Sequence, residues 1–266
     1  MNIISFNTAN YVARQLDYNM TRGWGQGDKA ANEHFRPIET FGERFDEMLG
    51  RIQSLGFEAI DLWLSQVNYP WATPDHIAIA KDLLAKYRFP VVSLVGWFGS
   101  TPDEFAATCK TAVALDCKIL GGSTSVLQKD RDFVVKTLQD HGLVLGLENH
   151  PEKTPQELLS KIGDPAGGTL GACVDTGWFG TQGYDAAKAL EELFPVLVNV
   201  HLKDVLAVGA HDTCGYGKGI VPIEDCVRTL KRLGYQGSIS IEHEPEHYNP
   251  EADCAEALRL VQGWLA

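Results

Sequence analysis

The stretch Val144-Leu145-Gly146-Leu147-Glu148-Asn149-His150-Pro151 decides the fold. It begins with a continuous apolar run, which is typical of a strand buried on both faces of a parallel sheet. Pro151 cannot donate a backbone hydrogen bond, so we expect the strand to end by that residue. Glu148 and His150 are two residues apart and therefore point to the same side. An apolar strand with this ending indicates the catalytic end of an α/β barrel.

Seven more strand-like runs occur along the chain, and a helical pattern follows each of the eight. The other runs are Ile3–Phe6, Phe57–Trp63, Val91–Trp97, Cys117–Gly122, Cys173–Asp175, Val198–His201 and Ile239–Glu242. Three helices are expected to start at Thr-Pro pairs, with Thr73, Thr101 and Thr154 as N-caps. Strict alternation at a mean period of about 33 residues predicts one α/β domain over residues 1–266, a (β/α)8 TIM-type barrel. An open doubly wound sheet is the alternative, but no Gly-x-Gly-x-x-Gly follows the first strand.

Residues 7–40 show no sustained hydrophobic periodicity and contain Gly23, Trp24, Gly25 and Gly27. A loop of this length inside a compact domain is commonly a lid or a binding loop. We therefore expect this segment to be a loop that closes over a bound ligand.

The composition excludes several classes of partner. A net charge of −12 argues against nucleic acid, which is bound by clustered Lys and Arg. No apolar run approaches the length of a membrane span, and no signal peptide is visible. The six cysteines are dispersed without a Cys-x-x-Cys pair, which indicates free thiols in a reducing compartment. We expect a cytoplasmic protein that acts on a small molecule and forms a homo-oligomer, either a dimer or a tetramer.

Four ionisable residues end four consecutive predicted strands: Glu148, Asp175, His201 and Glu242. Such strand ends meet at one face of a barrel, where active sites lie. Taken singly, each would be explained as a carboxylate of the rim or as a core histidine. Four buried charges together would be costly without a partner, so they predict a site for one divalent cation. Three carboxylates with one imidazole suit Mn²⁺ best, and Mg²⁺, Co²⁺ and Zn²⁺ remain open.

Tryptophans stand beside this predicted centre. Trp63 and Trp97 end the second and third strands, and Trp178 follows the sixth. They could simply pack the rim, but their positions favour a wall that stacks on the faces of a sugar. His150 and Lys203 also lie at strand ends and are candidate contacts to sugar hydroxyls.

Several motifs make the chain resemble a known family. They are Gly146-Leu147-Glu148-Asn149-His150, Val174-Asp175-Thr176-Gly177, His201-Leu202-Lys203-Asp204, His211-Asp212-Thr213 with Gly217-Lys218-Gly219, and Gly234-Tyr235-Gln236-Gly237 with Ile241-Glu242. The chain resembles the xylose isomerase-like TIM barrels, in particular the sugar phosphate isomerase/epimerase branch. The resemblance matches Glu148, Asp175, His201 and Glu242 to the four metal ligands of the family. It implies that His211 contacts the substrate.

The resemblance implies a metal-dependent sugar isomerase or epimerase. Glu148 and Glu242 would move a proton next to a carbonyl through an enediolate that the metal stabilises. A lyase or hydratase of a 3-keto sugar or keto-glycoside, using the same enediolate, is the alternative. A sugar-binding barrel without catalysis is a third hypothesis, which an incomplete set of metal ligands would favour.

Two departures from the family pattern bear on the reaction. Trp178 stands where many epimerases of the group have a His, and Thr154 stands where they have a second Glu; Glu152 is a stand-in for the latter. The superfamily also includes an endonuclease of abasic DNA that uses three metals. Tryptophans occupy the strand ends where its additional ligands would be needed, so we reject that reading.

Overall fold

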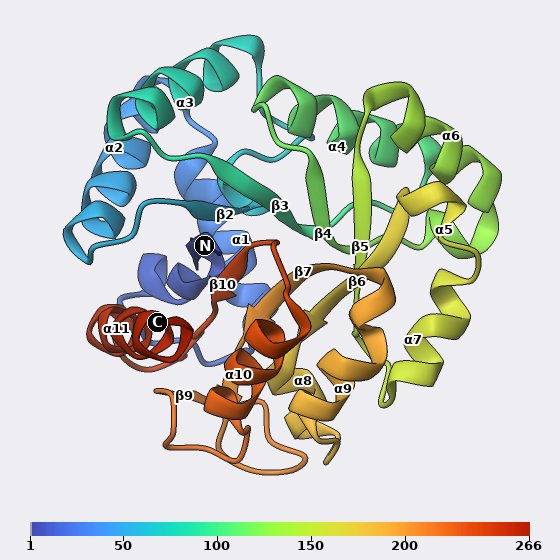
Figure 1. Cartoon of the computed structure of the whole chain (residues 1–266). Coiled ribbons are helices and arrows are strands. Elements are labelled where there is room, and N and C mark those ends of the chain that lie inside the picture. Colours follow the sequence, from blue (N-terminus) through green and yellow to red (C-terminus); the bar gives the residue numbers. More distant parts are fainter. Residues whose placement is uncertain (1) are drawn as a thin grey trace.

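The computed structural model describes residues 2–266 and confirms the (β/α)8 barrel. Eight parallel strands close in the order β1-β10-β7-β6-β5-β4-β3-β2, and helices surround them (Figure 1). The barrel strands are β1 (Ile4–Asn7), β2 (Ile60–Trp63), β3 (Val91–Trp97), β4 (Ile119–Ser123), β5 (Val144–Glu148), β6 (Leu170–Asp175), β7 (Leu197–Leu202) and β10 (Ile239–Ile241). The closed order leaves no sheet edge, as expected for eight βα units.

Most helices lie where the hydrophobic periodicity predicts them. They are α1 (Trp24–Phe35), α2 (Ile38–Ser54), α3 (Pro74–Tyr87), α4 (Pro102–Ala114), α5 (Val126–Lys129), α6 (Arg131–His141), α7 (Pro155–Ile162), α8 (Thr176–Thr181), α9 (Ala186–Leu193), α10 (Ile223–Leu233) and α11 (Glu251–Leu265). The three predicted N-caps are confirmed. The hydroxyls of Thr73, Thr101 and Thr154 each accept a hydrogen bond from the backbone N–H three residues later.

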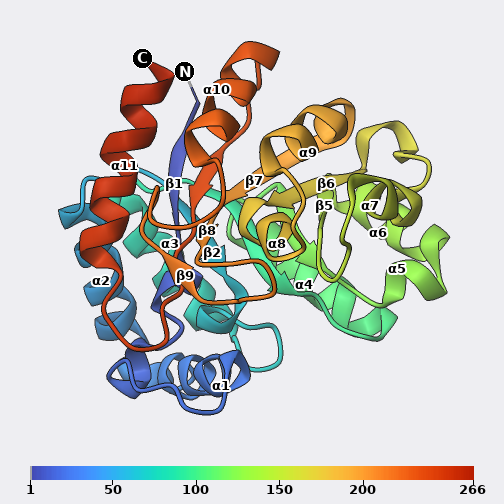
Figure 2. The same ribbon diagram turned by 90° about the horizontal axis from the view of Figure 1, so that it is seen from below.

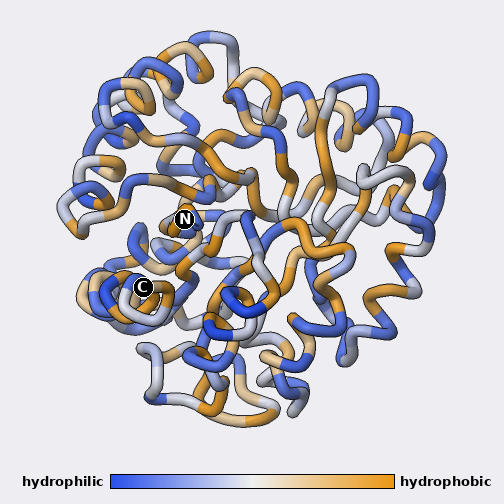
Figure 3. Tube along the Cα trace, viewed as in Figure 1, coloured by the Kyte–Doolittle hydropathy of each residue, from blue (hydrophilic) through white to orange (hydrophobic). Residues whose placement is uncertain are grey.

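The core lies between the strands and the inner faces of the helices. Figure 3 shows hydrophobic residues along the strands, whereas hydrophobic and hydrophilic positions alternate along the helices. On α2 the buried residues Phe41, Phe45, Met48, Leu49 and Ile52 recur every three or four positions. Strands β3 and β4 approach closely at Gly122, where a Cβ would overlap the carbonyl oxygen of Gly96. The glycine thus permits the spacing of the two strands there.

The expectation of a structureless loop over residues 7–40 is wrong. The segment contains two 3₁₀ turns, at Thr8–Tyr11 and Arg14–Leu16, and the twelve-residue helix α1. Only Gly27, Ala31 and Phe35 of α1 are buried. This narrow stripe contains two very small side chains, which is why the sequence shows little periodicity. Figure 2 shows α1 across the end of the molecule opposite the two termini. A lid role for the segment stays a prediction.

The connection between β7 and α10 contains a short antiparallel sheet. Its strands are β8 (Asp204–Val205) and β9 (Thr213–Cys214). The carboxylate of Asp204 accepts hydrogen bonds from the backbone N–H groups of Gly217, Gly219 and Val221. The buried Asp204 side chain therefore holds the end of this loop against the barrel. Over residues 2–266, no helix has both the length and the apolar character that crossing a membrane requires.

Candidate metal centre and sugar site

A cavity of about 940 Å³ opens at the carboxyl ends of the barrel strands. Ten of the predicted site residues line it: Trp63, Trp97, Glu148, His150, Asp175, Trp178, His201, Lys203, His211 and Glu242. Parallel strands bring their ends to this one face, so residues far apart in the sequence become neighbours.

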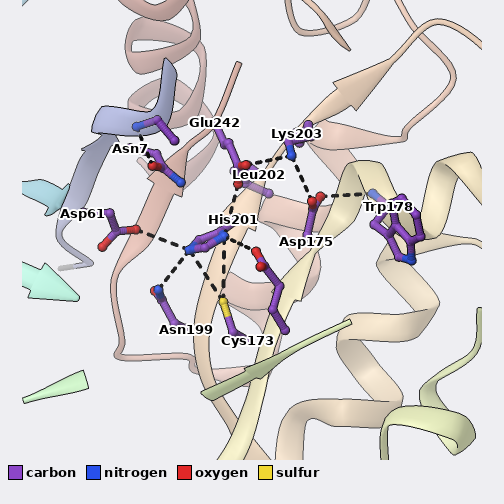
Figure 4. Close-up of polar contacts among 12 residues, drawn as sticks. Asn7, Asp61, Cys173, Asp175, Trp178, Asn199, His201, Leu202, Lys203 and Glu242 are labelled. Atoms are coloured by element: carbon purple, nitrogen blue, oxygen red, sulfur yellow. Dashed lines mark hydrogen bonds and ion pairs between the residues drawn. The ribbon is translucent and has the colours of Figure 1, made fainter. Parts of the chain in front are cut away.

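His201 lies at the centre of the predicted metal ligands. In the register of β6 and β7 it is paired with Asp175. Its Nδ1 is 2.7 Å from Oε1 of Glu148 and 3.1 Å from Oε2 of Glu242; Figure 4 shows His201 beside Glu242. Three of the four predicted ligands therefore meet around one imidazole nitrogen.

Two basic side chains, Lys203 and His150, complete the cluster. Lys203 Nζ lies 2.7 Å from Oε1 of Glu242 and 3.0 Å from Oδ2 of Asp175. His150 lies with Nε2 3.1 Å from Oδ2 of Asp175 and Nδ1 3.4 Å from Oε2 of Glu148. Acidic and basic groups thus alternate around a closed ring, in the order Glu148, His201, Glu242, Lys203, Asp175 and His150.

The ring favours the charged forms of Glu148, His150 and Lys203 although these side chains are buried. Burial alone would raise the pKa of Glu148, but His150 and His201 hold it well below its usual range. Burial would lower the pKa of His150, yet Glu148 and Asp175 raise it to about 10. Burial likewise opposes the charged form of Lys203, and Asp175 and Glu242 nevertheless keep its pKa well above the ordinary value. The protein therefore concentrates full charges at the bottom of the cavity.

The donor set fits a divalent cation. Oε2 of Glu242 is buried and makes no hydrogen bond of acceptable geometry with the described residues, although it lies near His201. Two groups of three residues place their donor atoms close enough to share an ion: Glu148, His150 and Asp175, and Glu148, Cys173 and His201. Carboxylate oxygens with imidazole nitrogens are the ligands of Mn²⁺ and Zn²⁺ sites. The grouping adds His150, which the sequence analysis assigned to the substrate, as a further potential ligand.

Aromatic side chains form the walls of the cavity. Trp178 is stacked with His211 at a centroid distance of 5.2 Å and meets His150 edge-on at 4.6 Å. Trp63 is buried and meets Trp24 of α1 at 5.0 Å. Trp97 stands at the edge with 52% of its surface exposed. An exposed indole beside a polar centre can stack on the C–H face of a sugar, whereas a buried one serves packing.

Glu152 is not among the residues that line the cavity. Its carboxylate is buried and forms an ion pair with Lys161 of α7. The backbone carbonyl of Glu152 accepts a hydrogen bond from Nε1 of Trp178 at 3.1 Å. Glu152 therefore supports the tryptophan wall, and its contact with a substrate stays a prediction. A charged partner on the following helix α7 was the signal that could have revealed its position outside the cavity.

The sequence analysis did not assign Trp24 or Glu244 to the site. Trp24 Nε1 donates a hydrogen bond to Oε1 of Glu244 at 3.1 Å, and Oε2 of Glu244 is 3.1 Å from Lys203 Nζ. Burial raises the pKa of Glu244 to about 7, against the opposing effect of Lys203. Glu244 lies two residues beyond Glu242 on the same strand exit, so the alternation that placed Glu148 and His150 could have identified it.

Comparisons with known proteins agree with the barrel fold. A family model described as xylose isomerase-like TIM barrel matches residues 49–264. The protein MJ1311 of Methanocaldococcus jannaschii is 31% identical over 140 residues, which are 48% of this chain and 44% of that protein. The chain thus matches less than half the length of this curated relative.

Three solved structures share the fold. A D-tagatose 3-epimerase-like protein has a TM-score of 0.70 at 17% identity, covering 99% of this chain and 98% of its own. The 3-keto-D-glucoside 4-epimerase YcjR of E. coli has a TM-score of 0.67 at 15% identity, with 99% and 100% covered. The IOLI protein, with a bound zinc atom, has a TM-score of 0.68 at 14% identity, with 99% and 98% covered. At these identities the likeness shows the fold.

Proposed function

The chain belongs to the xylose isomerase-like TIM barrel family, and from this premise we propose that it is a divalent-metal-dependent sugar isomerase or epimerase. The observation that carries the proposal is the position of Glu148 and Glu242, whose carboxylates meet at Nδ1 of the same imidazole, 2.7 and 3.1 Å away. They come from β5 and from the end of β10, on different sides of the barrel mouth. Two carboxylates that face one small volume can act on opposite faces of a sugar carbon.

We propose that Glu148, Asp175, His201 and Glu242 hold the cation, for which Mn²⁺ suits the donor set best. A cation there would draw electron density from the substrate carbonyl and so acidify the neighbouring C–H bond. Zn²⁺ also fits, and the zinc atom bound by the structurally similar IOLI protein supports a metal-binding role for a barrel of this fold.

The carboxylates of Glu148 and Glu242 would transfer the proton. Each carboxylate has one oxygen towards His201 and the other towards a neighbouring cation, His150 for Glu148 and Lys203 for Glu242. One oxygen can therefore remain bound at the metal centre while the other accepts or delivers the proton. If one carboxylate removes the proton and the other, already protonated, delivers its own proton to the opposite face, the carbon is inverted. Delivery of a proton to the adjacent carbon would isomerise the sugar.

The other polar groups of the cavity would bind the sugar. Lys203, His150 and His211 can donate hydrogen bonds to hydroxyls, and Trp97 and Trp178 offer faces for stacking. The names of two structural neighbours, a tagatose epimerase-like protein and a keto-glucoside epimerase, support a keto sugar as the substrate class.

Elimination from a 3-keto sugar is the second candidate. It is favoured by His211, whose imidazole lines the cavity, stacks on Trp178 and could protonate a leaving group. The two reactions share the first proton transfer and differ in the fate of the enediolate, which is either reprotonated or loses a substituent.

The test is to incubate the Mn²⁺-loaded protein with a panel of keto sugars and keto-glycosides in D₂O and to monitor them by NMR. Deuterium entering a C–H next to the carbonyl together with a new epimer or isomer supports the proposal. Exchange together with an unsaturated product assigns the lyase reaction instead. Metal binding without exchange in any sugar would contradict both.

A further inference from the structure

Asp61 is a fully buried carboxylate beneath the metal centre. It lies on β2, and its Oδ1 accepts a hydrogen bond from the hydroxyl of Ser93 on β3 at 2.7 Å. Its Oδ2 is buried and makes no hydrogen bond with the described residues. A buried carboxylate oxygen without a donor costs free energy, so a donor is expected to reach it in the functional state.

The side chains of Ser240 and Asn199 also lie beside this carboxylate, but the donor that belongs to the metal centre is the second nitrogen of His201. Nε2 of His201 lies 3.6 Å from Oδ2 of Asp61, slightly longer than a hydrogen bond, on the side of the ring away from Glu148 (Figure 4). A small rotation of the imidazole would close this distance. His201 thus stands between two sets of acids, with Nδ1 towards the cavity and Nε2 towards Asp61.

Two other groups also face Nε2. The Nδ2 of Asn199 is 3.3 Å away, and Sγ of Cys173 is 3.5 Å away. Asn199 is oriented by its neighbours, because its Oδ1 accepts from Ser238 and its Nδ2 donates to Ser93. Its NH₂ group can only donate, so it offers no acceptor for a hydrogen on Nε2 and competes with Asp61 for this nitrogen. The thiol is only a weak acceptor. Burial raises the pKa of Asp61, and His201 and Ser93 oppose that shift. In its ionised form Asp61 is the strongest acceptor of the three, since a hydrogen bond to a charged oxygen is roughly twice as strong as a neutral one.

We propose that Asp61 is a positioning residue that holds the hydrogen of His201 on Nε2 and so presents the lone pair of Nδ1 to the metal. This inference rests on the metal centre of the proposed function and concerns a residue outside its ligand set. A histidine ligand that donates its other N–H to a carboxylate is fixed in tautomer and orientation, and is more basic towards the metal. In the opposite tautomer the hydrogen would occupy Nδ1, between Glu148 and Glu242, where the cation should bind.

The test uses the full chain and two variants, Asp61→Asn and Cys109→Ala. Asp61→Asn keeps the shape of the side chain and replaces the carboxylate by an amide. Cys109→Ala is the control, because Cys109 is a buried residue of α4 that does not line the cavity. Titration calorimetry with Mn²⁺ should show that Asp61→Asn binds roughly 10- to 100-fold more weakly than the wild type. Cys109→Ala should bind like the wild type. An unchanged affinity in Asp61→Asn, or an equal loss in Cys109→Ala, would overturn the proposal.

A second measurement does not depend on the folding of a variant. In the Zn²⁺-loaded wild type labelled with ¹⁵N-histidine, NMR should show the His201 hydrogen on Nε2. A hydrogen on Nδ1 would overturn the proposal. Neither readout requires turnover, so a protein that binds metal with this tautomer but exchanges no sugar proton would contradict the proposed function and leave the role of Asp61 standing.

Discussion

Lys203 Nζ lies 2.7 Å from Oε1 of Glu242, and this buried ion pair joins the ends of β7 and β10 inside the cavity. The same ammonium also contacts Asp175 and Glu244, at 3.0 and 3.1 Å. One cation therefore lies between three carboxylates and weakens their mutual repulsion in a medium of low dielectric constant. The stability of the barrel mouth and the binding of a metal should consequently be linked.

The first prediction concerns this link. Lys203→Met should lower the free energy of unfolding by about 3–5 kcal/mol, because it leaves buried carboxylates without their cation. Added Mn²⁺ should restore part of the loss by supplying positive charge at the same place. Thermal unfolding with and without Mn²⁺ measures both effects. Lys161→Met is the matched control. It removes the cationic partner of another buried carboxylate, that of Glu152, which lies outside the cavity. Equal gains from Mn²⁺ in both variants would contradict the link.

The second prediction is the metal content. The protein reloaded with Mn²⁺ should hold about one equivalent per chain, and His201→Ala and Asp175→Ala should each lower it. His211→Ala should retain the metal, because His211 lies in the cavity wall and stacks on Trp178. Elemental analysis after dialysis gives the answer. Full metal content in both His201→Ala and Asp175→Ala would rule out the proposed ligand set.

The third prediction separates the two proton-transfer groups. Glu148→Gln and Glu242→Gln keep the shape and one oxygen for the metal but remove the base. Each should lose at least ~10²-fold in rate while retaining metal. In an epimerase, one of the two variants should still exchange the substrate C–H with D₂O from a single epimer without forming the other. Unimpaired turnover in both would show that the proton moves by another route.

Elimination would be indicated by two results together. Both glutamine variants would lose all C–H exchange, and a histidine variant would keep the exchange but form no product. In that case His150→Ala or His211→Ala should exchange the C–H with solvent but form no product, because the leaving group lacks its acid. The same NMR experiment in D₂O records both outcomes.

The fourth prediction concerns α1 as part of a lid. Trp24 Nε1 donates to Glu244 at 3.1 Å, so this helix contacts the cavity through a hydrogen bond that a bound sugar can strengthen. Deuterium uptake by the backbone of residues 24–35 should fall when a tight-binding sugar is present. Helix α6, on the outside of the barrel between β4 and β5, serves as the internal control. Identical uptake in α1 with and without sugar would refute the lid.

The fifth prediction tests the packing of two strands. Gly122→Ala should lower the free energy of unfolding by about 1–3 kcal/mol, since the added methyl group would overlap the carbonyl oxygen of Gly96 and force β3 and β4 apart. Gly263→Ala, on α11, is the control because a Cβ there meets nothing within 4 Å. Chemical denaturation compares the two. A loss in Gly122→Ala no greater than in Gly263→Ala would contradict the close approach.

Much of the barrel can be predicted from the sequence because the patterns that indicate its strands and helices are local. Apolar runs, the Thr-Pro helix starts at Thr73, Thr101 and Thr154, and the regular repeat each depend on residues a few positions apart. Once the barrel is inferred, its topology alone brings the strand ends together. Glu148, Asp175, His201 and Glu242 could therefore be grouped before any distance was known, and the cavity contains all four.

Other contacts of the site depend on the direction in which side chains point across the barrel. The hydrophobic periodicity of the sequence does not contain this information. Glu152 turned to Lys161, and Asp61 reached beneath His201 from a strand on the far side of the closed sheet. Helix α1 was hidden because its buried stripe contains Gly27 and Ala31, whose side chains are too small to produce a hydrophobic pattern. The alternating ring of charges likewise arose only when the chain folded, since most of its ion pairs join residues from different strands and depend on burial to be strong.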